Sequence, residues 1–150
     1  MIDEREIIRV KSWLDEAEKQ GAKILCGGER EGFIFKPTVI ENVTEEMRIV
    51  KDETFGPTLA LIKFKDFTDA VNKLNNSVYG LQACVFTENL RNAYHAIETL
   101  DVGGVMINDV PTFRIDLMPY GGLKDSGFGR EGPRYAVEEM TEIKCVRFHL

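Results

Sequence analysis

The chain has 150 residues, of which 43% are hydrophobic and 29% charged, and its formal net charge at pH 7 is −6. This length and composition fit one globular domain, and the acidic balance without dense Lys/Arg runs excludes a nucleic-acid partner. The apolar stretches are no longer than strands and the N-terminus lacks a secretory pattern, so we expect no membrane partner.

The first half of the chain begins with a predicted amphipathic helix over residues 2–20. Its apolar side chains recur every three or four residues, at Ile7, Val10, Trp13, Leu14 and Ala17. Asp3 and Glu6 resemble a capping box, and Gly21 suits the helix end. A strand over 22–25, a turn at 27–28 and a strand over 33–40 follow, with Pro37 indicating an edge or a bulge. Thr44 is predicted to cap one helical turn that ends at Met47.

From residue 59 onward, predicted strands and helices alternate. We expect strands over 59–64, 81–86 and 105–108, separated by a helix that Thr68 caps and a helix over 90–100. This β-α-β-α-β order with short connections predicts an α/β fold with a mainly parallel sheet flanked by helices. Residues 109–130 form a loop too long to be only a connection, so we expect function there.

A helix over 134–140 and a strand over 141–150 are predicted to close the chain. The strand places apolar groups on both faces, at Ile143, Cys145, Val146, Phe148 and Leu150. Such a strand needs a sheet to join, since an unpaired terminal strand normally frays. It either completes the sheet of this domain or pairs with another subunit.

Residues 119–132 hold five glycines, and Gly127 to Gly132 spell G-x-G-x-x-G. In a dinucleotide-binding site this string follows a buried strand and is followed by a second strand and an acidic residue. Here the polar residues 124–126 precede it, and only residues 133–150 follow. The string is therefore predicted to be a turn into the last helix rather than a phosphate-binding loop.

The cysteines and histidines offer no catalytic or metal-binding set. Cys26, Cys84 and Cys145 are widely spaced without a C-x-x-C pair, which fits a reducing compartment, and we expect a cytoplasmic protein. Cys84 is expected in the core, and none of the three has the exposed, electropositive setting of a reactive thiolate, so no catalytic residue is predicted. His95 and His149 have no ligand-spaced partners; we expect both to face solvent and no metal to bind.

The segment 50–57 carries a carboxylate two residues before an aromatic ring, followed by Gly56-Pro57. In an extended segment Glu53 and Phe55 lie on the same side. A carboxylate accepts hydrogen bonds from vicinal hydroxyls such as those of a ribose, and an aromatic ring supports a flat heteroaromatic group. The alternative is a capped turn with Phe55 in the core.

These strings together resemble a known family. Their order is Glu53-Thr54-Phe55-Gly56-Pro57, Tyr79-Gly80-Leu81, Val85-Phe86-Thr87, Val105-Met106-Ile107-Asn108 and the run 119–131. They resemble the C-terminal part of the NAD(P)-dependent aldehyde dehydrogenase superfamily, and the resemblance covers essentially the whole chain.

The resemblance implies a fold of three parts: a Rossmann-type cofactor domain, a catalytic α/β domain and a β arm for oligomerisation. Residues 1–140 then correspond to the C-terminal part of the catalytic domain, and residues 141–150 to the oligomerisation tail strand. The fold is incomplete relative to the full family. The expected partners are the missing N-terminal cofactor domain, further copies of the subunit and a small aldehyde substrate.

The resemblance also implies roles for four residues. Glu53 hydrogen-bonds the nicotinamide ribose of NAD or NADP, and Phe55 borders the nicotinamide. Tyr120 lines the substrate tunnel, where phenylalanine is commoner. The loop 111–118 is similar to that of members acting on lactaldehyde or on glyceraldehyde 3-phosphate, and Arg114 would hold a phosphate or carboxylate. Alternatively, Arg114 pairs with Asp116 or lies in solvent.

The implied reaction oxidises an aldehyde to a carboxylic acid through a cysteine thiohemiacetal. The family's catalytic cysteine and general-base glutamate lie upstream of every residue in this sequence, and the adenine-binding domain is missing. We therefore expect the isolated chain to be inactive. The alternative is a non-catalytic oligomerisation or interaction module derived from an aldehyde dehydrogenase.

Overall fold

The chain forms two compact units where its composition indicated one domain. In a computed structural model that describes residues 1–149, unit 1 spans Met1–Lys65 and unit 2 begins at Asp66. Each unit has its own hydrophobic core.

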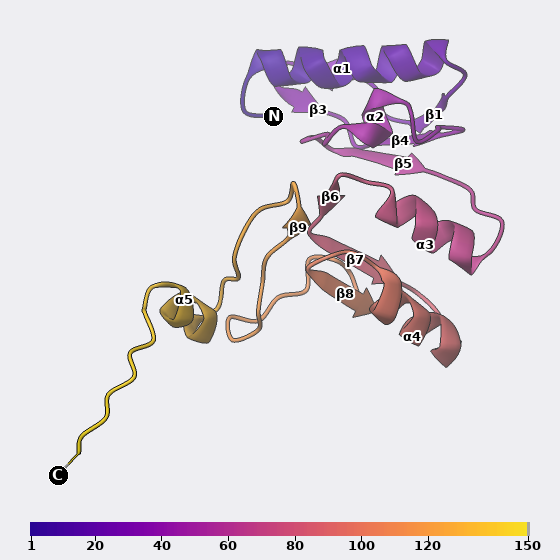
Figure 1. Cartoon of the computed structure of the whole chain (residues 1–150). Coiled ribbons are helices and arrows are strands. Elements are labelled where there is room, and N and C mark those ends of the chain that lie inside the picture. Colours follow the sequence, from indigo (N-terminus) through magenta and orange to yellow (C-terminus); the bar gives the residue numbers. More distant parts are fainter. Residues whose placement is uncertain (150) are drawn as a thin grey trace. The chain divides into compact units, whose positions relative to one another are not determined.

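Unit 1 packs a long helix on a three-stranded sheet (Figure 1). The helix is α1 (Glu4–Lys19), and the strands are β1 (Lys23–Cys26), β4 (Thr38–Glu41) and β5 (Thr58–Leu61). The order is β1-β4-β5, with β1 antiparallel and β5 parallel to β4. A short helix α2 (Arg48–Lys51) and a hairpin of β2 (Arg30–Glu31) and β3 (Ile34–Phe35) complete the unit.

Helix α1 confirms the amphipathic helix that was predicted over residues 2–20. The Asp3 side chain caps it by accepting a 3.0 Å hydrogen bond from the N–H of Glu6. The predicted apolar face is buried, with Ile7, Val10 and Leu14 fully inaccessible. Gly21 follows the helix end at φ 102°, a left-handed conformation that favours glycine.

Two boundaries in unit 1 differ from the prediction. The single strand expected over 33–40 is two strands, because the chain breaks at Pro37, which has no N–H to donate to a sheet. The helical turn begins later than expected, with Met47 rather than Thr44 preceding α2. Thr44 instead accepts a 3.2 Å backbone bond from Met47 in the turn before the helix.

Unit 2 is built around a parallel strand pair with two helices (Figure 1). The strands are β7 (Gln82–Val85) and β8 (Gly104–Ile107), and the helices are α3 (Phe67–Asn75) and α4 (Leu90–Thr99). The core consists of Val71, Ala83, Val85, Ala96 and Leu100. A short antiparallel pair, β6 (Tyr79–Gly80) with β9 (Leu123–Lys124), and helix α5 (Pro133–Glu139) follow.

The α/β class is confirmed, and the sheets are mixed. The β7-α4-β8 part of the expected order forms as predicted, with Gln82 to Val85 in parallel register with Gly104 to Ile107. The strand expected over 59–64 is β5, which pairs with β4 in unit 1 instead. Asp66 rather than Thr68 caps α3, accepting a 2.9 Å hydrogen bond from the N–H of Asp69.

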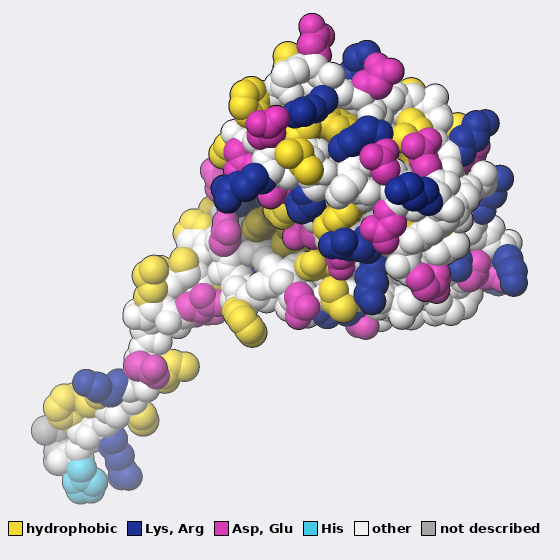
Figure 2. Space-filling model, turned by 90° about the horizontal axis from the view of Figure 1, so that it is seen from above, with side chains coloured by type: hydrophobic (Ala, Val, Ile, Leu, Met, Phe, Trp, Pro, Cys, Tyr) yellow, Lys and Arg dark blue, Asp and Glu magenta, His cyan; other side chains and the backbone are white. Residues whose placement is uncertain are grey.

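The C-terminal segment, residues 141–149, forms no strand and pairs with no sheet of this chain. Its apolar side chains are exposed (Figure 2): Ile143 by 102%, Val146 by 64% and Phe148 by 83%. Completion of the domain's own sheet is therefore not seen within the described residues. Leu150 lies outside them, and pairing with another subunit stays a prediction.

The cysteines and His95 differ from expectation. Cys26 and Cys145 are exposed, and Cys84 is only half-buried in β7. His95 is half-buried on α4, 6.0 Å from the Phe67 ring, and its Nε2 is buried without a hydrogen-bond partner. The prediction that His95 faces solvent is wrong because α3 covers this part of α4, whereas His149 is exposed.

Within residues 1–149, no group of three or more His, Cys, Asp or Glu side chains is arranged to hold a metal ion. No helix in the same range has the length and apolar character needed to cross a membrane.

Candidate functional site

Glu53 and Phe55 lie on an extended segment between α2 and β5 in unit 1. Phe55 is 72% exposed, so the alternative that buries this ring in the core is wrong. The Glu53 carboxylate is exposed as well, and it has no hydrogen bond or ion pair to any other residue within 1–149. Both predicted cofactor-binding side chains are thus available to a ligand.

Contacts on both sides hold this segment in place. The Thr54 hydroxyl donates to the carbonyl of Ile49 at 3.3 Å, and the N–H of Thr38 donates to the carbonyl of Pro57 at 2.8 Å. Gly56 packs against α1 so closely that a Cβ there would lie 3.1 Å from Cγ2 of Val10. The segment is therefore anchored to α2, β4 and α1.

Arg114 and Tyr120, the predicted substrate-binding residues, lie together in unit 2. The guanidinium carbon of Arg114 is 4.5 Å from the centroid of the Tyr120 ring, a cation–π distance. Nη2 of Arg114 lies 2.7 Å from Oε2 of Glu131. Arg114 therefore pairs with Glu131 rather than with Asp116, and its side chain stays 44% exposed to solvent.

Glu131 is a site residue that the sequence interpretation missed. Its N–H donates to the carbonyl of Tyr120 at 2.6 Å, and its carbonyl accepts from the N–H of Tyr120 at 3.2 Å. This antiparallel bridge joins the two ends of the glycine-rich run 119–132. The sequence offers little indication that Glu131 contacts Arg114, because the two residues are 17 positions apart with no regular periodicity between them.

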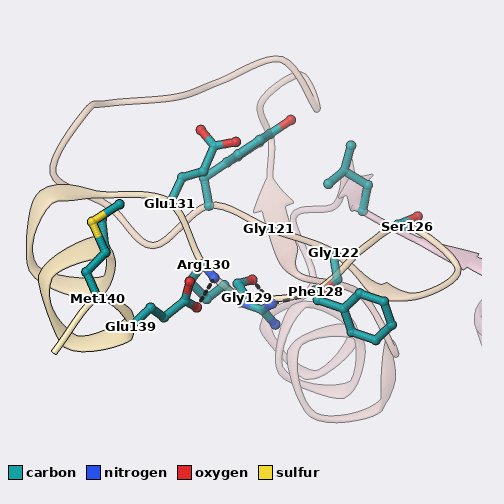
Figure 3. A pocket seen from close by; sticks show the side chains of 12 residues that line it. Gly121, Gly122, Ser126, Phe128, Gly129, Arg130, Glu131, Glu139 and Met140 are labelled. Atoms are coloured by element: carbon teal, nitrogen blue, oxygen red, sulfur yellow. Dashed lines mark hydrogen bonds between the residues drawn. The ribbon is translucent and has the colours of Figure 1, made fainter. Parts of the chain in front are cut away.

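A cleft of about 440 Å³ lies beside this bridge (Figure 3). Its lining includes Tyr120, Gly122, Phe128, Arg130, Glu139 and Met140.

Arg130 lines the cleft. Its Nη1 donates to the carbonyls of Gly122 at 2.9 Å and Gly129 at 2.7 Å. The backbone N–H of Arg130 donates to Glu139 at 3.0 Å, whereas the Glu131 side chain points away from this pair (Figure 3). Arg130 is therefore bonded both within the loop and to Glu139 of α5.

The glycines of the run 119–132 allow segments of backbone to approach one another. A Cβ on Gly121 would lie 2.5 Å from the Gly129 carbonyl, which is closer than real Cβ contacts. Gly132, at φ 114°, is the residue before α5, so the predicted turn into the last helix is confirmed. The strand before Gly127 has two residues and α5 has seven, which is not the context of a dinucleotide fingerprint.

Fold, motifs and site define the class of protein. The chain belongs to the aldehyde dehydrogenase family, whose sequence model matches residues 1–146.

Two curated relatives illustrate the similarity within this family. The chain is 44% identical over 150 residues to 3-sulfolactaldehyde dehydrogenase of Priestia aryabhattai, covering 100% of this chain and 31% of the relative. It is 46% identical over 149 residues to lactaldehyde dehydrogenase of Methanococcus maripaludis, covering 99% and 32% respectively. The chain thus spans slightly less than a third of the length of these relatives.

Solved structures of aldehyde dehydrogenases also match the chain. Aldehyde dehydrogenase 21 of Physcomitrella patens, in complex with the reaction product succinate, matches with a TM-score of 0.91 and 48% identity, over 95% of this chain and 30% of that one. Glyceraldehyde-3-phosphate dehydrogenase of Methanocaldococcus jannaschii, complexed with NADP, gives 0.87 and 38%, over 93% and 30%. Betaine aldehyde dehydrogenase of Staphylococcus aureus, in complex with NAD+, gives 0.86 and 36%, over 93% and 29%.

Proposed function

We propose that this chain is part of an NAD(P)-dependent enzyme that oxidises a small aldehyde to a carboxylic acid through a cysteine thiohemiacetal. In this proposal residues 1–140 are the C-terminal part of the catalytic domain, and residues 141–150 are the oligomerisation tail strand. The observation that carries it is the exposed, anchored Glu53–Phe55 pair in a chain that belongs to the aldehyde dehydrogenase family.

The role of this pair is to hold the nicotinamide end of the cofactor. The Glu53 carboxylate accepts hydrogen bonds from the ribose hydroxyls, and the Phe55 ring borders the nicotinamide. Support comes from the exposure of both side chains and from the contacts that fix Gly56 and Pro57. NAD or NADP, when bound, supplies the hydride acceptor, and related structures contain NADP or NAD+.

The role of Tyr120 and Arg114 is to receive the substrate. Tyr120 lines the tunnel, and Arg114 binds an anionic group remote from the aldehyde carbon. Several relatives are named for substrates or products with such a group: 3-sulfolactaldehyde, succinate and glyceraldehyde 3-phosphate. Another relative is named for lactaldehyde, which is a neutral hydroxyaldehyde. We therefore propose small hydroxyaldehydes, neutral or anionic, as the substrate class.

The isolated chain is proposed to be inactive and, with its three free cysteines, to belong in the cytoplasm. Cys84 is half-buried, and no histidine or lysine is bonded to Cys26 or Cys145 within the described residues. The test is incubation of the chain with NAD or NADP and short aldehydes. Sustained production of reduced cofactor would contradict the proposal.

The cofactor role is tested in a chimera in which this chain replaces the matching segment of the Methanococcus maripaludis lactaldehyde dehydrogenase. Glu53→Gln removes charge-assisted hydrogen bonds worth about 1.5–3 kcal/mol, so we expect the KM for the cofactor to rise roughly 10- to 100-fold. Asp52→Asn is the matched control, since Asp52 is engaged with Arg48. An unchanged cofactor KM in Glu53→Gln would contradict the role of this residue.

A second candidate, a non-catalytic oligomerisation module, is favoured by the exposed apolar tail. Light scattering of the chain, and of a version ending at Met140, tests it. The module requires self-association that is lost on truncation. A monomer at all concentrations would count against both the module and the arm role of residues 141–150.

A further inference from the structure

We propose that Glu131 is an internal counterion of Arg114, and that it sets the preference of the enzyme between anionic and neutral aldehydes. This inference rests on the proposed function, in which Arg114 meets the remote group of the substrate. It adds Glu131, which lies within the Gly127–Gly132 string, as a specificity-determining residue.

The geometry gives Arg114 two partners at once. Its guanidinium lies over the Tyr120 ring at 4.5 Å, and one of its terminal nitrogens lies 2.7 Å from a Glu131 oxygen. Glu131 and Tyr120 are joined by two backbone hydrogen bonds, so the carboxylate and the ring are positioned by the same bridge. The guanidinium is thus oriented by its ring contact and neutralised by its ion pair.

The pair remains open to exchange. The Arg114 side chain is 44% exposed and that of Glu131 64%, and ion pairs at such exposure contribute little. A guanidinium has five N–H donors and accepts a second carboxylate, phosphate or sulfonate in a bidentate geometry. The backbone bridge keeps Glu131 close, yet its side chain is free to rotate away when an anionic ligand arrives.

Other carboxylates near this loop do not share the role. Asp116 is two residues from Arg114, but the structure pairs Arg114 with Glu131 instead. Glu139 accepts from the backbone N–H of Arg130, and that pair lies on the side away from Glu131 (Figure 3). Glu131 is therefore the carboxylate through which the charge of Arg114 is balanced in the described residues.

The consequence is a site that tolerates both substrate classes. When a neutral hydroxyaldehyde binds, Arg114 keeps Glu131 as its partner and no unpaired charge is left behind. When an anionic aldehyde binds, its anionic group competes with Glu131 for the same donors. Removing the charge of Glu131 should therefore raise kcat/KM for the anionic substrate and leave kcat/KM for the neutral substrate nearly unchanged.

The test measures kcat/KM for glyceraldehyde 3-phosphate and for lactaldehyde in the chimera with the Methanococcus maripaludis lactaldehyde dehydrogenase. In Glu131→Gln we expect the ratio of anionic to neutral kcat/KM to rise about two- to five-fold, the size of an exposed ion pair, mainly through the KM of the anionic substrate. A loss of folding or of general catalysis affects both substrates and leaves the ratio unchanged. Asp116→Asn is the charge-matched control and should not change the ratio.

The variant Arg114→Met shows whether a failure concerns the counterion role of Glu131 or the proposed substrate role of Arg114. If Arg114→Met does not lower the ratio, Arg114 does not bind the anionic group, and the proposed substrate role is wrong. If Arg114→Met lowers the ratio but Glu131→Gln leaves it constant or lowers it, the counterion inference alone is overturned. A ratio that falls in Arg114→Met and rises in Glu131→Gln, with Asp116→Asn unchanged, supports both.

Discussion

The hydroxyl of Ser126 accepts a 2.9 Å hydrogen bond from the N–H of Gly80, which lies 46 residues earlier in the chain. This bond ties the glycine-rich loop to β6, at the place where β6 pairs with β9. Ser126, which directly precedes the Gly127–Gly132 string, thus stabilises the loop from within unit 2.

Ser126→Ala should therefore destabilise unit 2. The partly buried N–H of Gly80 loses its acceptor, and a group left without a partner costs about 1–3 kcal/mol. Native-state hydrogen exchange at the amides of β7 and β8 measures the change. The control is Ser77→Ala, whose hydroxyl accepts from the exposed N–H of Tyr79, and it should cost less. Equal protection in both variants would contradict the structural role of Ser126.

Two neighbouring glycines at the start of β8 should respond differently to alanine. A Cβ on Gly103 would lie 1.6 Å from the backbone oxygen of Gly121, which cannot move without displacing the glycine-rich loop. We expect Gly103→Ala to cost at least about 3 kcal/mol, the upper end of overpacking effects. At Gly104 a Cβ meets only side-chain atoms of Gln82 and Met106 at 3.4 Å or more, so its cost should stay below about 1 kcal/mol. Denaturant titration of both variants distinguishes them, and equal costs would contradict the close approach.

Asn75 joins the ends of α3 and α4. Its side-chain amide donates to the carbonyl of Thr99 at 2.6 Å, and its oxygen accepts from the N–H of Asp101 at 2.9 Å. Asn75→Ala removes both bonds and should cost about 2 kcal/mol, since each contributes about 1 kcal/mol. Asn72→Ala, at an exposed position of α3, is the matched control and should be neutral or slightly stabilising. Thermal unfolding followed by circular dichroism compares the two, and similar melting temperatures would contradict the bridging role.

Features set by local chemistry were predictable from the sequence. Helix α1 followed from the spacing of its apolar residues, and its cap followed from Asp3. The exposure of Phe55 was one of two alternatives, because a ring beside Gly56-Pro57 fits either a core or a binding surface. The structure decides between them, since Gly56 packs on α1 and leaves the ring outside.

Features set by pairing between distant segments were not predictable. Strand β5 joins β4 rather than continuing the β7-β8 sheet, and no pattern inside a short apolar strand specifies its neighbour. Likewise, the Arg114–Glu131 pair depends on the bridge between Tyr120 and Glu131, which forms across an irregular loop. Pairing with Asp116, the nearer carboxylate in sequence, was one of the alternatives, and Glu131 was not among them because an irregular loop gives no periodicity from which to infer contact.

The start of α1 should make the stability of unit 1 dependent on pH in the acid range. The hydrogen bond from the N–H of Glu6, followed by that from Arg5, holds the pKa of Asp3 below its usual value. A carboxyl group whose pKa is lower in the folded state stabilises fully above its unfolded pKa, about 3.9, and loses that contribution as the pH falls through the folded value. Stability that depends on Asp3 should therefore be present at pH 6 and diminish below about pH 4.

Two substitutions isolate this contribution. Asp3→Asn keeps a side-chain oxygen for the cap but does not titrate, so the loss of stability between pH 6 and pH 3 should be smaller than in the unaltered chain. Asp3→Ala removes the cap and should be less stable already at pH 6. Trp13 is the only tryptophan, lies on α1 and is 7% exposed, so its fluorescence during urea unfolding reports on unit 1. If Asp3→Asn loses as much stability on acidification as the unaltered chain, other carboxyl groups account for the acid sensitivity, and the charged cap does not.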